Sequence, residues 1–180
     1  MRIHKKVLWI TRTAILIALL VVLQALTVPL GYTIVTGSVV NLMLIISVMT
    51  CGPATGLSVA VVAPVMSKLL GIGPFWSLIP FIAAGNIVLV LLWHFIGNRN
   101  FGIKYAAHIA ALIVGAVGKF LVLYTGVILI AVPYILGLTE QQATVVTSMY
   151  SVPQLFTAMT GGVCAIILLP TLKKGVIRKP

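Results

Sequence analysis

The sequence predicts an all-α integral membrane protein with about six spanning helices and with both termini on the cytoplasmic side. Hydrophobic residues make up 61% of the chain and charged residues only 7%, a balance that a water-soluble domain of this size does not tolerate. The apolar residues form long runs separated by Pro and Gly, and most cations lie between the runs or in the tails. These runs fill the chain, so we expect one transmembrane domain, 1–180.

The first two runs are predicted to be spanning helices at 7–28 and 37–49. The first stops at Pro29 and Gly31, because Pro lacks a backbone N–H and Gly frees the backbone. The second is short and stops at the Cys51-Gly52-Pro53 turn. A loop at 29–36 is expected between them.

The remaining runs predict helices at 54–70, 76–96, 104–136 and 147–169. Pro64 and Pro80 indicate kinks or local unwinding in the third and fourth helices. The stretch 104–136 is too long for one simple span, and we expect it to break near Pro133. Pro170 is expected to end the last helix.

The positions of the cations predict the orientation of the chain, because Lys and Arg are retained on the cytoplasmic side. With the N-terminus inside and six crossings, all of the 12 Lys and Arg residues except Lys68 and Lys119 fall in inside segments. Topology therefore explains the basic character of the chain, and we expect no nucleic-acid partner.

Catalysis is not favoured by the residues present. One acid, Glu140, cannot build a metal or general-base cluster. His94 and His108 sit near the cytoplasmic ends of their helices, where interfacial anchoring is the ordinary role. The two cysteines lack metal-site spacing. We expect no catalytic residue, metal or cofactor, although a serine–histidine membrane protease stays open as an alternative.

Lys68 and Lys119 are unusual because an ammonium inside the hydrocarbon layer costs several kcal/mol unless it snorkels, finds partners or lines a wet cavity. Two interpretations stay open. In one, both residues snorkel to the outer interface; in the other, they face a cavity that receives an acidic or strongly hydrogen-bonding solute.

Side-chain amides interrupt the apolar runs at Gln24, Asn41, Asn86 and Gln154. Any one of them needs no ligand, because it can hydrogen-bond between helices. Several lie at similar predicted depth, so we expect one outer-half pocket, suited to a small, flat, polar molecule, lined by Gln24, Asn86, Gln154, Trp76, Tyr134 and Tyr150.

The chain resembles the substrate-binding S component of an energy-coupling factor (ECF) vitamin transporter over nearly its whole length. The resemblance lies in its size, its six predicted spans, and the stretches 13–20 (TAILIALL), 36–41 (TGSVVN) and 79–86 (IPFIAAGN). It implies a multi-pass protein of the bacterial cell membrane. It also implies that Ala14 and Ala18 contact a transmembrane scaffold subunit, which two cytoplasmic ATPases drive.

The resemblance further implies that the loop after the first helix gates a vitamin pocket, with Pro29, Gly31, Tyr32 and Thr36 as gate residues. The candidate substrate-binding residues are then Gln24, Tyr32, Lys68, Trp76, Asn86, Lys119, Tyr134, Tyr150 and Gln154. No acid is placed in the pocket, which disfavours a cation such as thiamine. Hydroxymethylpyrimidine or pyridoxine fits best, and pantothenate fits if Lys68 or Lys119 points inward.

Two other classes of function remain as alternatives. One is a self-sufficient small-solute transporter or channel, although no intramembrane acid or repeated polar stripe supports it. The other is the intramembrane enzyme considered above. Transport by the purified chain alone would favour the first of these.

Overall fold

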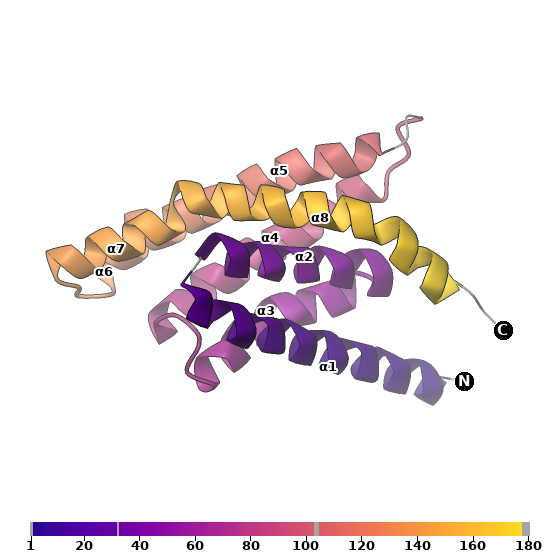
Figure 1. Cartoon of the computed structure of the whole chain (residues 1–180), viewed down its shortest axis with the longest axis horizontal. Helices are drawn as coiled ribbons and strands as arrows, with labels where there is room; N and C mark the ends of the chain where they lie inside the picture. The colour runs from indigo at the N-terminus through magenta and orange to yellow at the C-terminus, as the bar shows by residue number, and fades with distance from the viewer. Residues whose placement is uncertain (1, 32, 103–104, 178–180) are drawn as a thin grey trace.

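The computed structural model describes residues 2–31, 33–102 and 105–177, and within these ranges it contains helices and no strand. The long helices run roughly along one axis (Figure 1). Five helical segments are long and apolar enough to cross a membrane, and a shorter apolar helix, Pro53–Leu69, makes a sixth. The predicted fold class of an all-α membrane protein is therefore confirmed.

The first half of the chain forms four long helices. They are α1 (Arg2–Thr27), α2 (Thr33–Cys51), α3 (Pro53–Leu69) and α4 (Ile79–Gly97), with the short 3-10 turns η1 (Val28–Leu30) after α1 and η2 (Trp76–Leu78) before α4. Gly52 separates α2 from α3 with φ 90°, a backbone conformation that only glycine adopts readily. This glycine lets the chain reverse with almost no loop.

The second half of the chain is less regular than the first. α5 (Ala106–Leu123) continues directly into a π-helix, η3 (Tyr124–Ala131), and a last turn, α6 (Val132–Tyr134). Then α7 (Glu140–Tyr150) and α8 (Val152–Ile177) follow. A capping box between Thr139 and Gln142 begins α7, and it satisfies backbone groups that the first turn leaves free.

Three expected boundaries differ from those observed. α2 begins at Thr33 rather than at residue 37, so the expected loop at 29–36 is reduced to η1 and a turn at Gly31. The helical run that begins with α5 ends at Tyr134, next to Pro133, after the π-helix. The expected last span 147–169 is α7 and α8 meeting at Ser151, and Pro170 lies inside α8.

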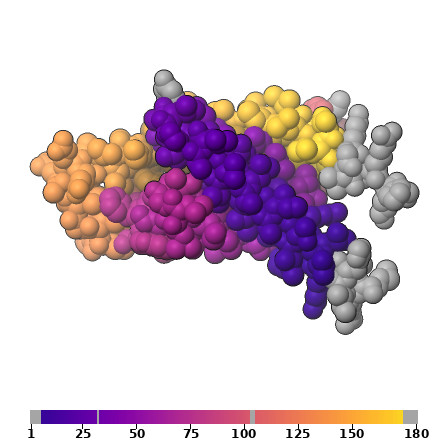
Figure 2. All heavy atoms as spheres, turned by 60° about the horizontal axis from the view of Figure 1, so that its bottom comes forward, coloured from indigo at the N-terminus to yellow at the C-terminus, as the bar shows by residue number. Residues whose placement is uncertain are grey.

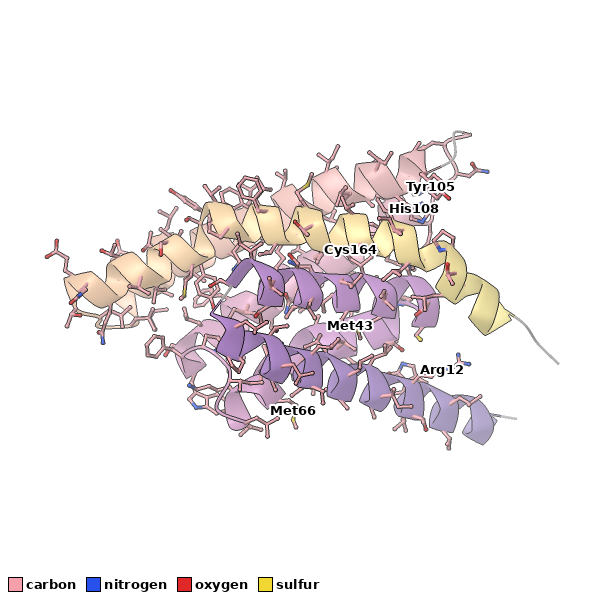
Figure 3. The ribbon with its side chains drawn as sticks, in the orientation of Figure 1. Arg12, Met43, Met66, Tyr105, His108 and Cys164 are labelled. Atoms are coloured by element: carbon pink, nitrogen blue, oxygen red, sulfur yellow. The ribbon has the colours of Figure 1, made fainter. Side chains whose placement is uncertain are left out.

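The two ends of the molecule differ in what they contain. Figure 1 shows the N- and C-termini at one end and α6 and α7 at the other. Figure 3 places Arg12, Tyr105 and His108 toward the end with the termini. This arrangement matches the predicted even number of crossings, and we call the end with α6 and α7 the distal end.

The core consists of apolar side chains contributed by neighbouring helices. α2 packs against α8, and α4 against α5. Leu44, Val59, Trp93 and Ala165, from four different helices, are fully buried in the main cluster. Among the long helices, α1 packs mainly on α2 and α3, and Figure 2 shows it lying across one face of the molecule. The outer side of α1 is therefore uncovered.

Candidate ligand-binding site

A cavity of about 170 Å³ lies among the helices. It lies toward the distal end, because its lining includes residues in the last turns of α1, α3 and α5 and in the first turns of α2 and α4. Its walls come from α1, α2, α3, α4, α5, α7 and α8, so no single element builds it. Apolar side chains such as Leu20 and Leu123 form part of the lining. The polar residues that line it are Gln24, Thr33, Thr36, Asn41, Ser67, Asn86, Lys119, Tyr150 and Gln154.

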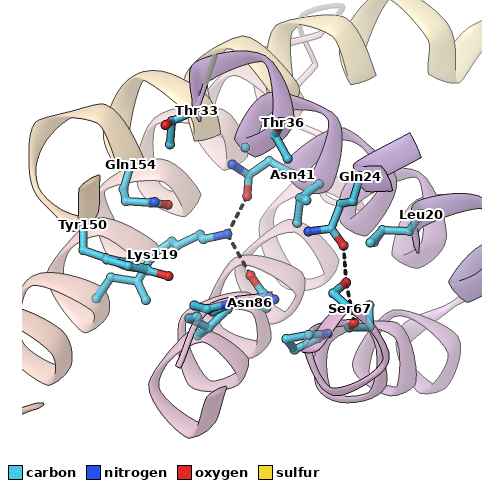
Figure 4. A pocket seen from close by; sticks show the side chains of 17 residues that line it. Leu20, Gln24, Thr33, Thr36, Asn41, Ser67, Asn86, Lys119, Tyr150 and Gln154 are labelled. Carbon is cyan, nitrogen blue, oxygen red and sulfur yellow. Dashed lines mark hydrogen bonds between the residues drawn. The ribbon is translucent and has the colours of Figure 1, made fainter. Parts of the chain in front are cut away.

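Lys119 is the only cation in the lining of this cavity among the described residues. Its side chain is 3% exposed. Its Nζ donates to Asn41 Oδ1 at 2.6 Å and to Asn86 Oδ1 at 2.7 Å. Figure 4 shows the ammonium between the two amides, which come from α2 and α4. Lys119 therefore points inward and does not snorkel.

The two amides are held with their oxygens toward Lys119. Asn41 Nδ2 donates to Thr157 Oγ1 at 3.2 Å, and Thr157 Oγ1 donates to the Gln154 carbonyl at 3.0 Å. Asn86 Nδ2 donates to the Ala60 carbonyl at 3.4 Å. Because each NH₂ group has an acceptor elsewhere, each oxygen is left for the ammonium. The site is thus built before any solute enters.

A second polar pair lines the cavity where α1 meets α3. Ser67 Oγ lies 2.5 Å from Gln24 Oε1 and 2.9 Å from the Ala63 carbonyl. The oxygen of the Gln24 amide therefore faces Ser67, and its nitrogen is directed toward the middle of the group of side chains in Figure 4. No described residue accepts a hydrogen bond from that nitrogen. Gln24 thus brings to the cavity an N–H donor that no described residue satisfies.

The rim of the cavity is formed partly by the first turn of α2. Thr33 is exposed and Thr36 is half-buried, and both line the cavity. The sequence analysis expected a loop here after Pro29 and Gly31, although both threonines lie in α2. A polar face toward a cavity does not interrupt a helix, which is why the expected start at residue 37 was wrong.

The expected substrate-binding residues fall into two groups. Five line the cavity, namely Gln24, Asn86, Lys119, Tyr150 and Gln154. Three do not: Trp76 is 55% exposed, Tyr134 is 82% exposed, and Lys68 is half-buried near the end of α3. Tyr32 lies outside the described residues. A role in binding stays a prediction for each of them.

The position of Lys68 follows from helix geometry. Its neighbour Ser67 faces the cavity, and adjacent residues on an α-helix point about 100° apart. Lys68 is therefore rotated away from the lining. Of the expected gate residues, Thr36 lines the cavity, whereas Pro29, within η1, and Gly31, directly after it, are exposed and do not.

Asn41 and Ser67 line the cavity without having been expected there. Asn41 stood out in the sequence as an amide in an apolar run, but nothing in the sequence connected it to Lys119. Ser67 had no distinguishing feature, because serine is common in membrane helices. Knowledge of which helix faces meet was needed to find either residue.

The described part of the chain contains no group of three His, Cys, Asp or Glu that could hold a metal. His94 lies against Asn98, 3.3 Å from its Nδ2, and His108 packs near Trp93. Neither histidine is hydrogen-bonded to a serine within the described ranges. Cys51 and Cys164 are both free.

A family model described as "ECF transporter, substrate-specific component" matches residues 9–172. No curated protein and no solved structure matches the chain. The matched region includes every described residue that lines the cavity, together with Ala14 and Ala18. The chain therefore belongs to the family of substrate-specific components of ECF transporters, which are binding subunits and not enzymes.

Proposed function

We propose that the chain captures a small vitamin or vitamin precursor in the cavity around Lys119 and passes it inward as part of an ECF importer of the bacterial cell membrane. The observation that carries this proposal is the cavity itself. It gathers an ammonium and four side-chain amides from different helices in a chain that is 61% hydrophobic. Buried polar groups of this kind are costly in a membrane and mark solute sites.

The dimensions and chemistry of the cavity suit a small polar solute. About 170 Å³ is available, and the lining offers hydrogen-bond donors and acceptors beside the ring of Tyr150 and apolar walls. Pyridoxine, hydroxymethylpyrimidine and pantothenate are the candidate classes. Each presents hydroxyl, amine or carboxylate groups that the lining can hydrogen-bond.

The proposed scaffold contact is the uncovered side of α1. Ala14 and Ala18 are both exposed and lie one helical turn apart on this side. Small residues at such spacing let a partner helix approach closely. In this assignment a scaffold subunit packs on α1, and two ATPases attached to the scaffold supply the energy.

Reconstitution in proteoliposomes tests the proposal. The chain is assayed alone and with an ECF scaffold and its two ATPases, using radiolabelled pyridoxine, hydroxymethylpyrimidine, pantothenate and nicotinate. We expect the chain alone to bind one solute without accumulating it, and the complete complex to accumulate it only with ATP. Accumulation by the chain alone would instead establish a self-sufficient transporter.

A variant of the α1 face separates binding from transport in the same assay. Ala18→Leu is expected to keep solute binding and to abolish ATP-dependent accumulation, because the larger side chain holds the partner helix away. Ala54→Leu is the matched control, since Ala54 is exposed at the start of α3. Equal loss of binding in Ala18→Leu would refute the assignment of this face.

A further inference from the structure

We propose that the cavity selects solutes that carry one negative charge, with a carboxylate as the chemical class, and that Lys119 is the residue that holds this charge. This inference rests on the proposed function, because it concerns the same cavity. It goes further because the proposed function leaves both charged and neutral vitamins as candidates, whereas this inference selects the monoanionic ones.

The first argument concerns the charge that the cavity contains. Lys119 is 3% exposed, and the two acceptors of its ammonium, Asn41 and Asn86, are neutral amides. Amide dipoles offset part of the desolvation cost, but they do not neutralise the charge. The one acid in the sequence, Glu140, is exposed in the first turn of α7 and does not line the cavity. The counter-charge is therefore left for the solute.

The second argument concerns hydrogen-bond valence. An ammonium has three N–H donors, and Asn41 and Asn86 accept two of them. The third has no acceptor in the described part of the chain. Because Lys119 lines the cavity, a carboxylate oxygen of the solute can occupy this third position. A charge-assisted hydrogen bond of this kind is about twice as strong as a neutral one.

The third argument concerns the second carboxylate oxygen and the number of charges. Gln24 brings a side-chain N–H without a described acceptor to the same cavity, and Thr36 adds a hydroxyl at the rim. These groups can donate hydrogen bonds to the second carboxylate oxygen of the solute, which the Lys119 ammonium does not bind. With a single cation in the described lining, a doubly charged phosphate ester would leave one charge unpaired, so the arrangement favours a monoanionic carboxylate.

Pairs of compounds that differ mainly in charge test the inference. Nicotinate with nicotinamide, pantothenate with panthenol, biotin with biotinamide, and benzoate with benzamide are titrated onto the purified chain. Binding is measured by calorimetry and, at millimolar concentrations, by the rise in unfolding temperature. We expect at least one acid to bind about 100-fold more tightly than its neutral counterpart.

Substitutions of two lysines test whether Lys119 causes the preference for acids. Lys119→Met is expected to weaken binding of the acid by about 100-fold, whereas Lys173→Met, at a residue in the C-terminal part of α8 that does not line the cavity, is expected to leave it unchanged. Lys119→Gln keeps an N–H donor without the charge, and it provides the same comparison if the Met variant folds poorly.

Two results would overturn the inference. One is a neutral compound that binds as tightly as its acid, which would indicate a neutral lysine that accepts a hydrogen bond. The other is that no acid in the panel binds the unaltered chain. Neither result decides the proposed function. The proteoliposome assay tests that function separately, and it includes neutral solutes.

Discussion

At the residue scale, the properties of the cavity depend on which groups surround the Lys119 ammonium. Its two amide acceptors are oriented by Thr157 and Ala60, so the charge is held in place but not cancelled. A protein that carried its own carboxylate at this point would pair the lysine internally and would leave less attraction for an incoming anion.

Two substitutions of Asn41 should therefore change the stability of the chain in opposite directions. Asn41→Asp places a carboxylate beside Lys119, and the Thr157 hydroxyl can turn to donate to it. We expect a higher unfolding temperature and at least about tenfold weaker binding of acids. Asn41→Leu removes an acceptor from a buried ammonium and should destabilise the chain by about 1–3 kcal/mol. Thermal unfolding in detergent measures both, and lower stability in both variants would contradict this account.

The chemistry of single residues was largely predictable from the sequence, but their partners were not. An ammonium and amides inside apolar runs are conspicuous, and Lys119, Asn86, Gln24 and Gln154 were expected in a pocket for that reason. The pairing of Lys119 with Asn41 depends on the rotation of α5 and α2 about their axes. Hydrophobic periodicity does not determine that rotation when a helix is apolar on nearly all sides.

At the element scale, the contact between α2 and α8 positions Asn41 against Thr157, and it depends on a glycine. A Cβ added to Gly161 would lie 2.5 Å from the Ser38 carbonyl oxygen and 2.9 Å from the Leu42 backbone nitrogen. Backbone atoms of a packed helix cannot move aside cheaply. Close approach of two membrane helices through small residues is a common packing device.

Gly161→Ala should accordingly separate α2 from α8 and lower the free energy of unfolding by about 1–3 kcal/mol. Gly118→Ala is the matched control, since its Cβ would meet mainly Leu92 Cδ1 at 2.6 Å, the end of a flexible side chain. There the gain in helix propensity offsets the contact, and we expect little change. Circular dichroism during thermal unfolding measures both, and equal effects would contradict the assignment.

Helix ends were the least predictable elements. Pro29 and Gly31 predicted a loop as far as residue 36, whereas Thr33 and Thr36 lie in α2 and line the cavity. Pro170 was read as a terminator, yet it lies inside α8, where a membrane helix tolerates proline because the freed carbonyl finds other partners. The π-helix after α5 has no sequence pattern from which it could be inferred.

At the scale of the whole molecule, charge and topology agree. The termini lie at one end and the α6–α7 end is opposite (Figure 1), and Arg12, Arg99 and Lys173 fall in segments assigned to the inside. The whole-chain fold was predictable because lipid imposes helices and because cations report orientation.

Reporter fusions test this topology. Green fluorescent protein attached to either terminus should fluoresce, since it folds in the cytoplasm, and alkaline phosphatase fused after Leu138 should be active, since it requires the outside. Fusion of the phosphatase after Asn100, in the α4–α5 connection, is the inactive control. Fluorescence from only one terminus would mean an odd number of crossings and would contradict the arrangement.

α1 belongs to two surfaces at once. Leu20 and Gln24 line the cavity, and Ala14 and Ala18 lie on its uncovered side. A helix moves as a stiff rod. A solute that draws Gln24 inward therefore also changes the angle at which α1 lies against the rest of the molecule, and with it the orientation of its outer side. Occupancy and angle are then thermodynamically linked, and linkage is reciprocal. A partner that prefers one angle of α1 must therefore change the affinity of the cavity for its solute. The solute must change the affinity of α1 for that partner by the same factor.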